Sequence, residues 1–125
     1  MKLSTLMVLN TVICAVFGIA FVLLPLQVYS LYGLEAGPQL NYMGQLFGAA
    51  LIAFAILSWS ARNAEASDAR KAIVLAFLIG DGIGFFVALI GQLGGVVSTL
   101  GWSTVAIYLI LALGFGYFQF SKSSS

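Results

Sequence analysis

Asp81 is the residue of this chain whose type and position are best suited to chemistry. It is the one charged residue within positions 72–121, a stretch that is otherwise apolar or neutral. An acidic side chain near the middle of a membrane span costs on the order of 2.5–3.5 kcal/mol on insertion scales, so it must face protein or water. The sequence leaves two interpretations open: Asp81 carries a proton or ion or contacts a small substrate, or it makes an interhelical hydrogen bond.

Candidate partners for Asp81 follow from depth along the helices. At about 1.5 Å of rise per residue, Asp81 lies roughly 18 Å from the outer end of its span, and Asn10 falls near the same depth. We therefore predict that Asn10 is the partner of Asp81 in a ligand, proton or ion site. Three further polar residues lie in the outer half of the spans and are expected to form a second, shallower cluster: Gln45, Tyr108 and Gln92.

Several common chemistries lack their residues in this chain. The sequence contains no histidine and one cysteine, which excludes a histidine-ligated haem, a Ser-His-Asp triad, a zinc site and a disulfide framework within it. Cys14, in the middle of an apolar run, is expected to be a small buried hydrophobic residue. The acids are spread over both sides and the core, which disfavours an enzyme acting on lipid. We expect no catalytic residue, no metal and no cofactor.

The composition indicates a protein that lives in a lipid bilayer. Hydrophobic residues make up 62% of the 125 residues, charged residues make up 7%, and the mean hydropathy is +1.09. A soluble domain carries about 25% charged residues, and it would expose too much apolar surface with so few. Five lysines and arginines, with a net charge of +1, are too few to bind nucleic acid. The predicted partner is therefore the lipid bilayer.

The elements that must position Asp81 are four membrane-spanning helices. About 20 mainly apolar residues are needed to cross the hydrocarbon core, and the glycines between positions 94 and 101 mark a tight turn between the last two spans. The sequence thus predicts an all-α fold, an integral membrane four-helix bundle in a single domain over 1–125. The predicted spans are 4–24, 41–61, 72–93 and 102–120.

The positive charges predict an orientation. Lys2, the connection 62–71 and Lys122 hold all five positive residues on one side of a four-span bundle, and the other side has Glu35. By the positive-inside rule both termini are cytoplasmic. The connection 62–71 is expected to extend its flanking helices or to dock a soluble partner. The apolar connection 25–40 is expected to form a short amphipathic turn or to cap the bundle.

Small residues at four-residue spacing predict close helix packing, either within the chain or between chains. A pair in the second span, three residues in the third and a pair in the fourth have this pattern: Gly44 and Gly48, Gly80, Gly84 and Ala88, and Ala112 and Gly116. These residues favour self-association or contact with other membrane subunits.

A few sequence features resemble a known group of proteins. They are Leu24-Pro25 at the end of the first span, Tyr32-Gly33-Leu34, the segment 44–48, Trp59 and Trp102. In these features the chain resembles uncharacterised small bacterial four-helix inner-membrane proteins of the DoxX-like kind. The resemblance implies a multi-pass protein of the bacterial cell inner membrane, and it implies no catalytic residue.

Small packing residues are plentiful in this sequence, and chemically competent groups are few. We therefore expect a non-catalytic multi-pass membrane protein, an accessory or packing subunit of a larger membrane complex or a homo-oligomer. The alternative is a small transporter or channel that uses the intramembrane Asp81 with Asn10.

Overall fold

The computed structural model describes residues 2–35 and 37–120, and these residues form five α-helices. Four of the helices are long and apolar enough to cross a membrane, as predicted, and the second is short. The helices are α1 (Leu3–Leu23), α2 (Pro25–Leu31), α3 (Pro38–Ala61), α4 (Asp68–Leu93) and α5 (Gly101–Phe120).

Prolines and a capping serine set the helix starts. Pro25 and Pro38 open α2 and α3, where the missing N–H would have no intrahelical partner. The side chain of Ser67 accepts a hydrogen bond from the backbone N–H of Arg70 at 3.2 Å and caps α4. As a result α3 and α4 begin before the expected positions 41 and 72, and α4 takes up part of the connection 62–71.

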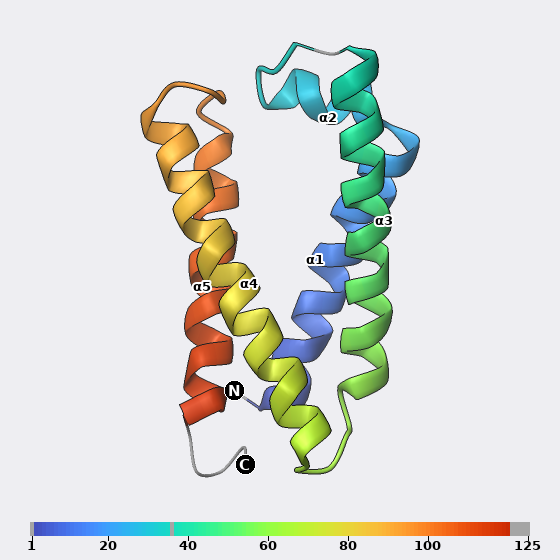
Figure 1. Cartoon of the computed structure of the whole chain (residues 1–125), viewed down its shortest axis with the longest axis vertical. Coiled ribbons are helices and arrows are strands. Elements are labelled where there is room, and N and C mark those ends of the chain that lie inside the picture. The colour runs from blue at the N-terminus through green and yellow to red at the C-terminus, as the bar shows by residue number, and fades with distance from the viewer. Residues whose placement is uncertain (1, 36, 121–125) are drawn as a thin grey trace.

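Two glycines allow the tight turns at one end of the molecule. Gly33, after α2, has φ +72°, and Gly95, after α4, has φ +75°, a region that side chains with a Cβ rarely adopt. The turn predicted between 94 and 101 is therefore confirmed. The connection 25–40 does contain a short helix, α2, which lies across this end of the molecule (Figure 1).

The long helices are arranged as two pairs, α1 with α3 and α4 with α5 (Figure 1). The start of α1, the connection 62–67 and the end of α5 lie together at what we call the terminal end. The short helix α2 and the turn 94–100 lie at the opposite end, called the α2 end. From the terminal end the two pairs diverge toward the α2 end (Figure 1).

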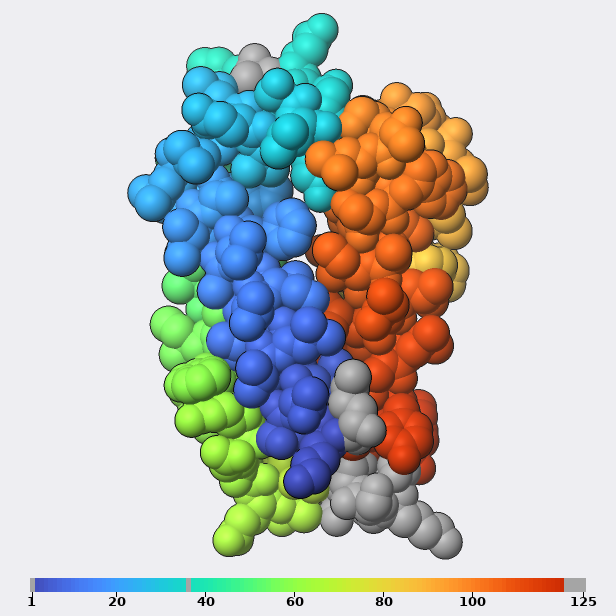
Figure 2. Space-filling view, turned by 180° about the vertical axis from the view of Figure 1, so that it is seen from behind, coloured from blue at the N-terminus to red at the C-terminus, as the bar shows by residue number. Residues whose placement is uncertain are grey.

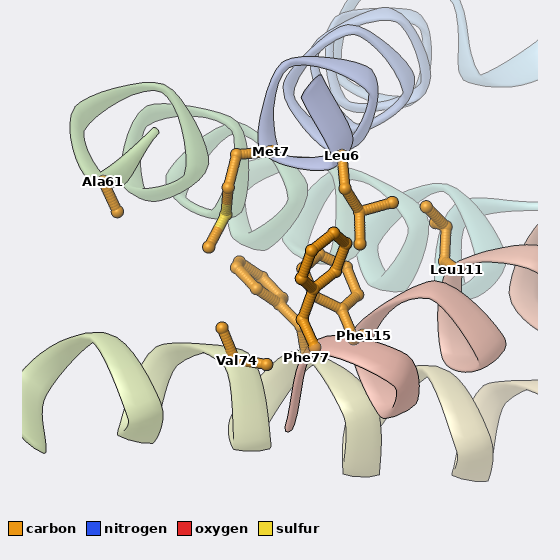
Figure 3. Packing of buried hydrophobic residues seen from close by; sticks show 8 residues of the cluster. Leu6, Met7, Ala61, Val74, Phe77, Leu111 and Phe115 are labelled. Atoms are coloured by element: carbon orange, nitrogen blue, oxygen red, sulfur yellow. The ribbon is translucent and has the colours of Figure 1, made fainter. Parts of the chain in front are cut away.

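An apolar core joins the two pairs near the terminal end (Figure 3). The ring centroids of Phe77 and Phe115 lie 5.1 Å apart, and those of Phe54 and Phe77 lie 5.9 Å apart. The apolar core consists of Leu6, Met7, Ala61, Val74, Phe77, Leu111, Phe115 and Phe118. The buried residues of α4, Val74 and Phe77, both belong to this core, so the second half of α4 is more loosely packed.

Glycines bring α1 and α3 into backbone contact. A Cβ on Gly48 would lie 2.8 Å from the carbonyl oxygen of Gly18, and a Cβ on Gly18 would lie 2.9 Å from that of Gly48. The ring of Tyr29 occupies the space beside Gly44, and the ring of Tyr108 that beside Gly84. The structure thus gives the predicted packing residues Gly44, Gly48 and Gly84 close contacts.

The remaining predicted packing residues differ in their surroundings. A Cβ on Gly116 would make an ordinary contact with Leu78 at 3.4 Å, and Ala88 and Ala112 are half-buried. Gly80, in contrast, is exposed, and a Cβ there would meet no described atom within 4 Å. The expected pairing of Gly80 with Gly84 on one contact face is therefore not found within the chain, because Gly80 lies on the outward side of α4.

Candidate functional site

Asn10 and Ser58 form the most deeply buried polar pair among the described residues. Their side chains are 1% and 0% exposed, and the Asn10 Nδ2 donates to Ser58 Oγ at 2.6 Å. Ser58 Oγ in turn donates to the carbonyl oxygen of Phe54 at 2.8 Å. This contact joins α1 to α3. The hydrogen bond expected between Asn10 and Asp81 is thus replaced by one to Ser58, a residue that the sequence reasoning missed.

Cys14 lies one helical turn from Asn10 on the same face of α1. It is buried, as expected, and its Sγ donates weakly to Asn10 Oδ1 at 3.8 Å. Asn10 therefore uses its nitrogen toward α3, and its amide oxygen has only the weak thiol donor among the described hydrogen bonds. That oxygen keeps acceptor capacity, because an amide oxygen has two lone pairs.

Asp81 lies on the inward face of α4, one turn beyond Phe77 of the apolar core. The side chain is half-buried, and its Oδ2 is shielded from solvent and makes no hydrogen bond to any described residue. Asp81 lies close enough to Cys14 and Tyr108 for electrostatic interaction. The structure thus brings Asp81 near Cys14, one turn along α1 from the predicted partner Asn10.

The second polar cluster expected from the sequence is not formed. Gln45 is exposed and donates to the carbonyl oxygen of Val22 at 3.2 Å, while Gln92 donates to that of Ser98 at 3.3 Å. Tyr108 packs on Gly84 and lies near Asp81 instead. Tyr108 was therefore expected too far from Asp81, and the direction of each side chain around its helix was not predicted.

A set of hydrogen bonds joins the two pairs at the α2 end. The hydroxyls of Tyr32 and Thr104 lie 2.7 Å apart. The backbone N–H of Ser98 donates to the carbonyl oxygen of Tyr32 at 2.8 Å, and its hydroxyl donates to that of Leu31 at 3.0 Å. We call these four residues the α2-end contact.

Polar side chains lie between the apolar core and the α2-end contact. We call this set the polar layer: Asn10, Cys14, Ser58, Asp81 and Tyr108. Figure 2 shows a narrow opening between α1, in blue, and α5, in orange, below the place where segment 31–34 meets the turn 94–100. Part of the seam between the two helix pairs is therefore loosely packed.

The polar layer offers oxygen acceptors, a thiol and one carboxyl, without a basic group. The described basic residues, Lys2, Arg62, Arg70 and Lys71, all belong to the terminal end. Among residues 2–35 and 37–120, no three histidine, cysteine or acidic side chains gather in a group that could hold a metal ion. The layer is suited to hydrogen bonding and to binding positive charge.

Comparison with known proteins identifies a family without an assigned activity. No curated protein and no solved structure matches the chain. One family model, described as a domain of unknown function, matches residues 1–120. Because that match covers nearly the whole length, the chain belongs to the DUF8292 family.

Proposed function

We propose that this protein is a non-catalytic multi-pass membrane protein that acts as a packing subunit of a larger membrane complex or of a homo-oligomer. The observation that carries the proposal is the outward face of α4. Ala72, Ala76 and Gly80 follow one another there at four-residue spacing and are all exposed. A Cβ at Gly80 would meet no described atom within 4 Å.

This face has the chemistry of a helix contact inside a bilayer. Lipid tails are as apolar as leucine, so helices associate there through close packing, which small residues permit. Within the chain α4 buries Val74 and Phe77 on its opposite side. The small-residue face is therefore available to a helix of another subunit or of a second copy.

The proposed orientation places the terminal end in the cytoplasm. The basic residues described above lie at that end, and positive residues are enriched in cytoplasmic connections. Lys122, the remaining basic residue, lies outside the described residues. The resemblance noted in the sequence supports a bacterial inner membrane as the compartment.

Sizing after gentle solubilisation tests the assembly. We expect the wild type to run as a particle containing more than one chain of 13.2 kDa. Gly80→Leu should shift it to the monomer, because a large side chain separates close-packed helices. Ala106→Leu, at an exposed position of α5, is the matched control and should leave the size unchanged. A wild-type monomer at every expression level contradicts the proposal.

A second candidate function is favoured by the unpartnered Oδ2 of Asp81. A carboxyl inside a membrane span is a candidate for carrying a proton, an ion or a small solute, and Asp81 with the nearby Asn10 network would do so in a small transporter or channel. Here purified protein in liposomes conducts protons or a small solute, Asp81→Asn abolishes the flux, and Asp68→Asn at the start of α4 retains it. Equal flux through both variants contradicts this candidate.

A further inference from the structure

We infer that the polar layer binds a small organic ammonium ion with an apolar body, whose positive charge faces Asp81. This inference rests on the second candidate function only for its location, because it claims binding and does not require flux. It is also independent of assembly through α4, since Asp81 and Gly80 lie on different faces of that helix.

Asp81 has no countercharge among the described residues around it. Its Oδ2 has no hydrogen-bond partner among the described residues, and the described basic residues all lie at the terminal end. A buried carboxyl without a partner is costly, because burial removes the hydration of its charged form. A cation that enters the layer supplies both the missing charge and the missing donor.

The other members of the polar layer are neutral groups that can accept hydrogen bonds. The Asn10 amide oxygen receives only the weak Cys14 donor, and Tyr108 lies within the range of electrostatic interaction with the carboxyl. An ammonium group has up to three donors and needs only a few acceptors. Divalent metal ions such as calcium and magnesium take six or more oxygen ligands, a larger set than the carboxyl, amide and hydroxyl oxygens of this layer.

Aromatic and apolar side chains of the core lie next to the polar layer, on its terminal-end side. Phe77, one turn from Asp81, packs against Phe115 with ring centroids 5.1 Å apart, and the ring centroid of Phe54 lies 5.9 Å from that of Phe77. Aromatic rings attract cations that have lost their water, and they also pack against an alkyl chain. The site therefore favours a cation with an apolar body over a small hydrated ion.

The two ends of the seam between the helix pairs differ. The apolar core fills the space toward the terminal end (Figure 3), whereas an opening separates α1 from α5 toward the α2 end (Figure 2). At the α2 end itself, the two pairs are joined by the α2-end contact, which includes the Tyr32–Thr104 hydroxyl pair. We therefore expect the ligand to enter through this opening or by separation of the α2-end contact.

The experiment uses hexylammonium as the probe and Cys14 as the reporter, because Cys14 is the single cysteine of the chain. The full-length protein is placed in lipid nanodiscs, and the rate of Cys14 modification by methyl methanethiosulfonate, which reacts with thiols and not with the amine of the probe, is measured against probe concentration. We expect saturable protection by hexylammonium and none by hexan-1-ol, which has the same chain without the charge. Protection by both, or by neither, overturns the inference.

Three variants locate the charge contact. Asp81→Asn should raise the hexylammonium concentration that gives half-maximal protection about tenfold or more, because the ammonium loses its charged partner. Tyr108→Phe keeps the ring on Gly84 and should raise the half-maximal hexylammonium concentration about threefold, because one hydroxyl acceptor is lost. Asp68→Asn, on the same helix but at the terminal end, should behave as the wild type. Unchanged protection in Asp81→Asn overturns the inference.

Binding at Asp81 can be distinguished from assembly through α4 and from transport. If Asp81→Asn does not fold, the difference between hexylammonium and hexan-1-ol in the wild type, together with Tyr108→Phe, decides the question. A monomeric Gly80→Leu variant should still show protection, so loss of assembly and loss of binding are distinguishable. Protection without flux in liposomes supports a binding site and contradicts the transport candidate alone.

Discussion

Two residues that are far apart in the sequence, Asn10 and Ser58, fix how α1 lies on α3. Their hydrogen bond of 2.6 Å is completely shielded from solvent. Hydrogen bonds between membrane helices contribute about 0.6 kcal/mol on average and up to about 1.7 kcal/mol. The contact is therefore modest in energy but specific in direction, since the Asn10 Nδ2 would otherwise be buried without a described partner.

Replacing Ser58 tests this contact. We expect Ser58→Ala to lower the free energy of unfolding by about 1 kcal/mol, because Asn10 Nδ2 loses its acceptor. Unfolding in mixed micelles with increasing sodium dodecyl sulfate measures this change. Ser60→Ala, at an exposed position of the same helix, is the control and should be neutral. A loss of the same size in both variants would show that the hydrogen bond is not responsible.

The glycine contact between α1 and α3 gives a second prediction at this scale. Gly48→Ala should lower the free energy of unfolding by about 1–3 kcal/mol, because its Cβ would lie 2.8 Å from the Gly18 carbonyl oxygen. Gly82→Ala meets no described atom within 4 Å and should raise stability by up to about 1 kcal/mol, since alanine favours helix formation. The same unfolding assay measures both variants, and a stabilising Gly48→Ala would be inconsistent with the contact.

Asn10 is buried and Asp81 is half-buried, but Asn10 forms its hydrogen bond with Ser58 and not with Asp81, the partner predicted from the sequence. The rise of 1.5 Å per residue gives depth along each span, whereas the partner depends on how each helix is rotated. Rotation is set by contacts such as Gly18 with Gly48, between residues 30 positions apart, which no local pattern encodes. Ser58 was missed for the same reason, because the sequence does not show that Ser58 is buried while Ser60, two positions later, is exposed.

At the scale of the elements, the α2-end contact decides how far the two helix pairs separate. Its described hydrogen bonds connect segment 31–32 with Ser98 and Thr104. The apolar core closes the other end of the seam. The pairs are thus held at both ends and are less tightly packed between them.

Removing one hydroxyl should loosen the α2 end. We expect Tyr32→Phe to broaden and lengthen the distance distribution between spin labels at Gln27 and Thr99, two exposed positions, because the hydroxyl pair with Thr104 is lost. Pulsed electron–electron double resonance spectroscopy in nanodiscs measures this distance distribution. Tyr42→Phe, at an exposed tyrosine on α3, is the matched control. An unchanged distribution in Tyr32→Phe would show that this hydroxyl pair does not hold the pairs together.

The existence of the four long helices was predictable because apolar stretches of that length have few other structures in a bilayer. Their starts were less accurate. Hydropathy locates the apolar part of a helix, while Pro38 and the Ser67 cap add polar first turns to α3 and α4. The short helix α2 was foreseen only as an amphipathic turn or cap, since seven residues give a weak periodic signal.

At the scale of the whole molecule, the arrangement in two pairs could not be derived from the sequence. Glycine and alanine stripes occur in several spans, and a stripe does not say whether it meets a helix of its own chain or of another. Gly44 and Gly48 turned out to face their own chain, whereas Gly80 faces outward. This difference makes the outward face of α4 the main basis for proposing an assembly.

Photo-cross-linking in native membranes tests that proposal most directly. Ile83 lies on the outward face of α4, one turn from Gly80, and is 60% exposed, and Ile110 on α5 is similarly exposed at 58%. Each is replaced in turn by p-benzoylphenylalanine, and the membranes are irradiated before solubilisation. We predict a cross-linked product, with this chain or another protein, that is much stronger from position 83 than from position 110. A monomer band alone from position 83, or equal products from both positions, would contradict assembly through α4.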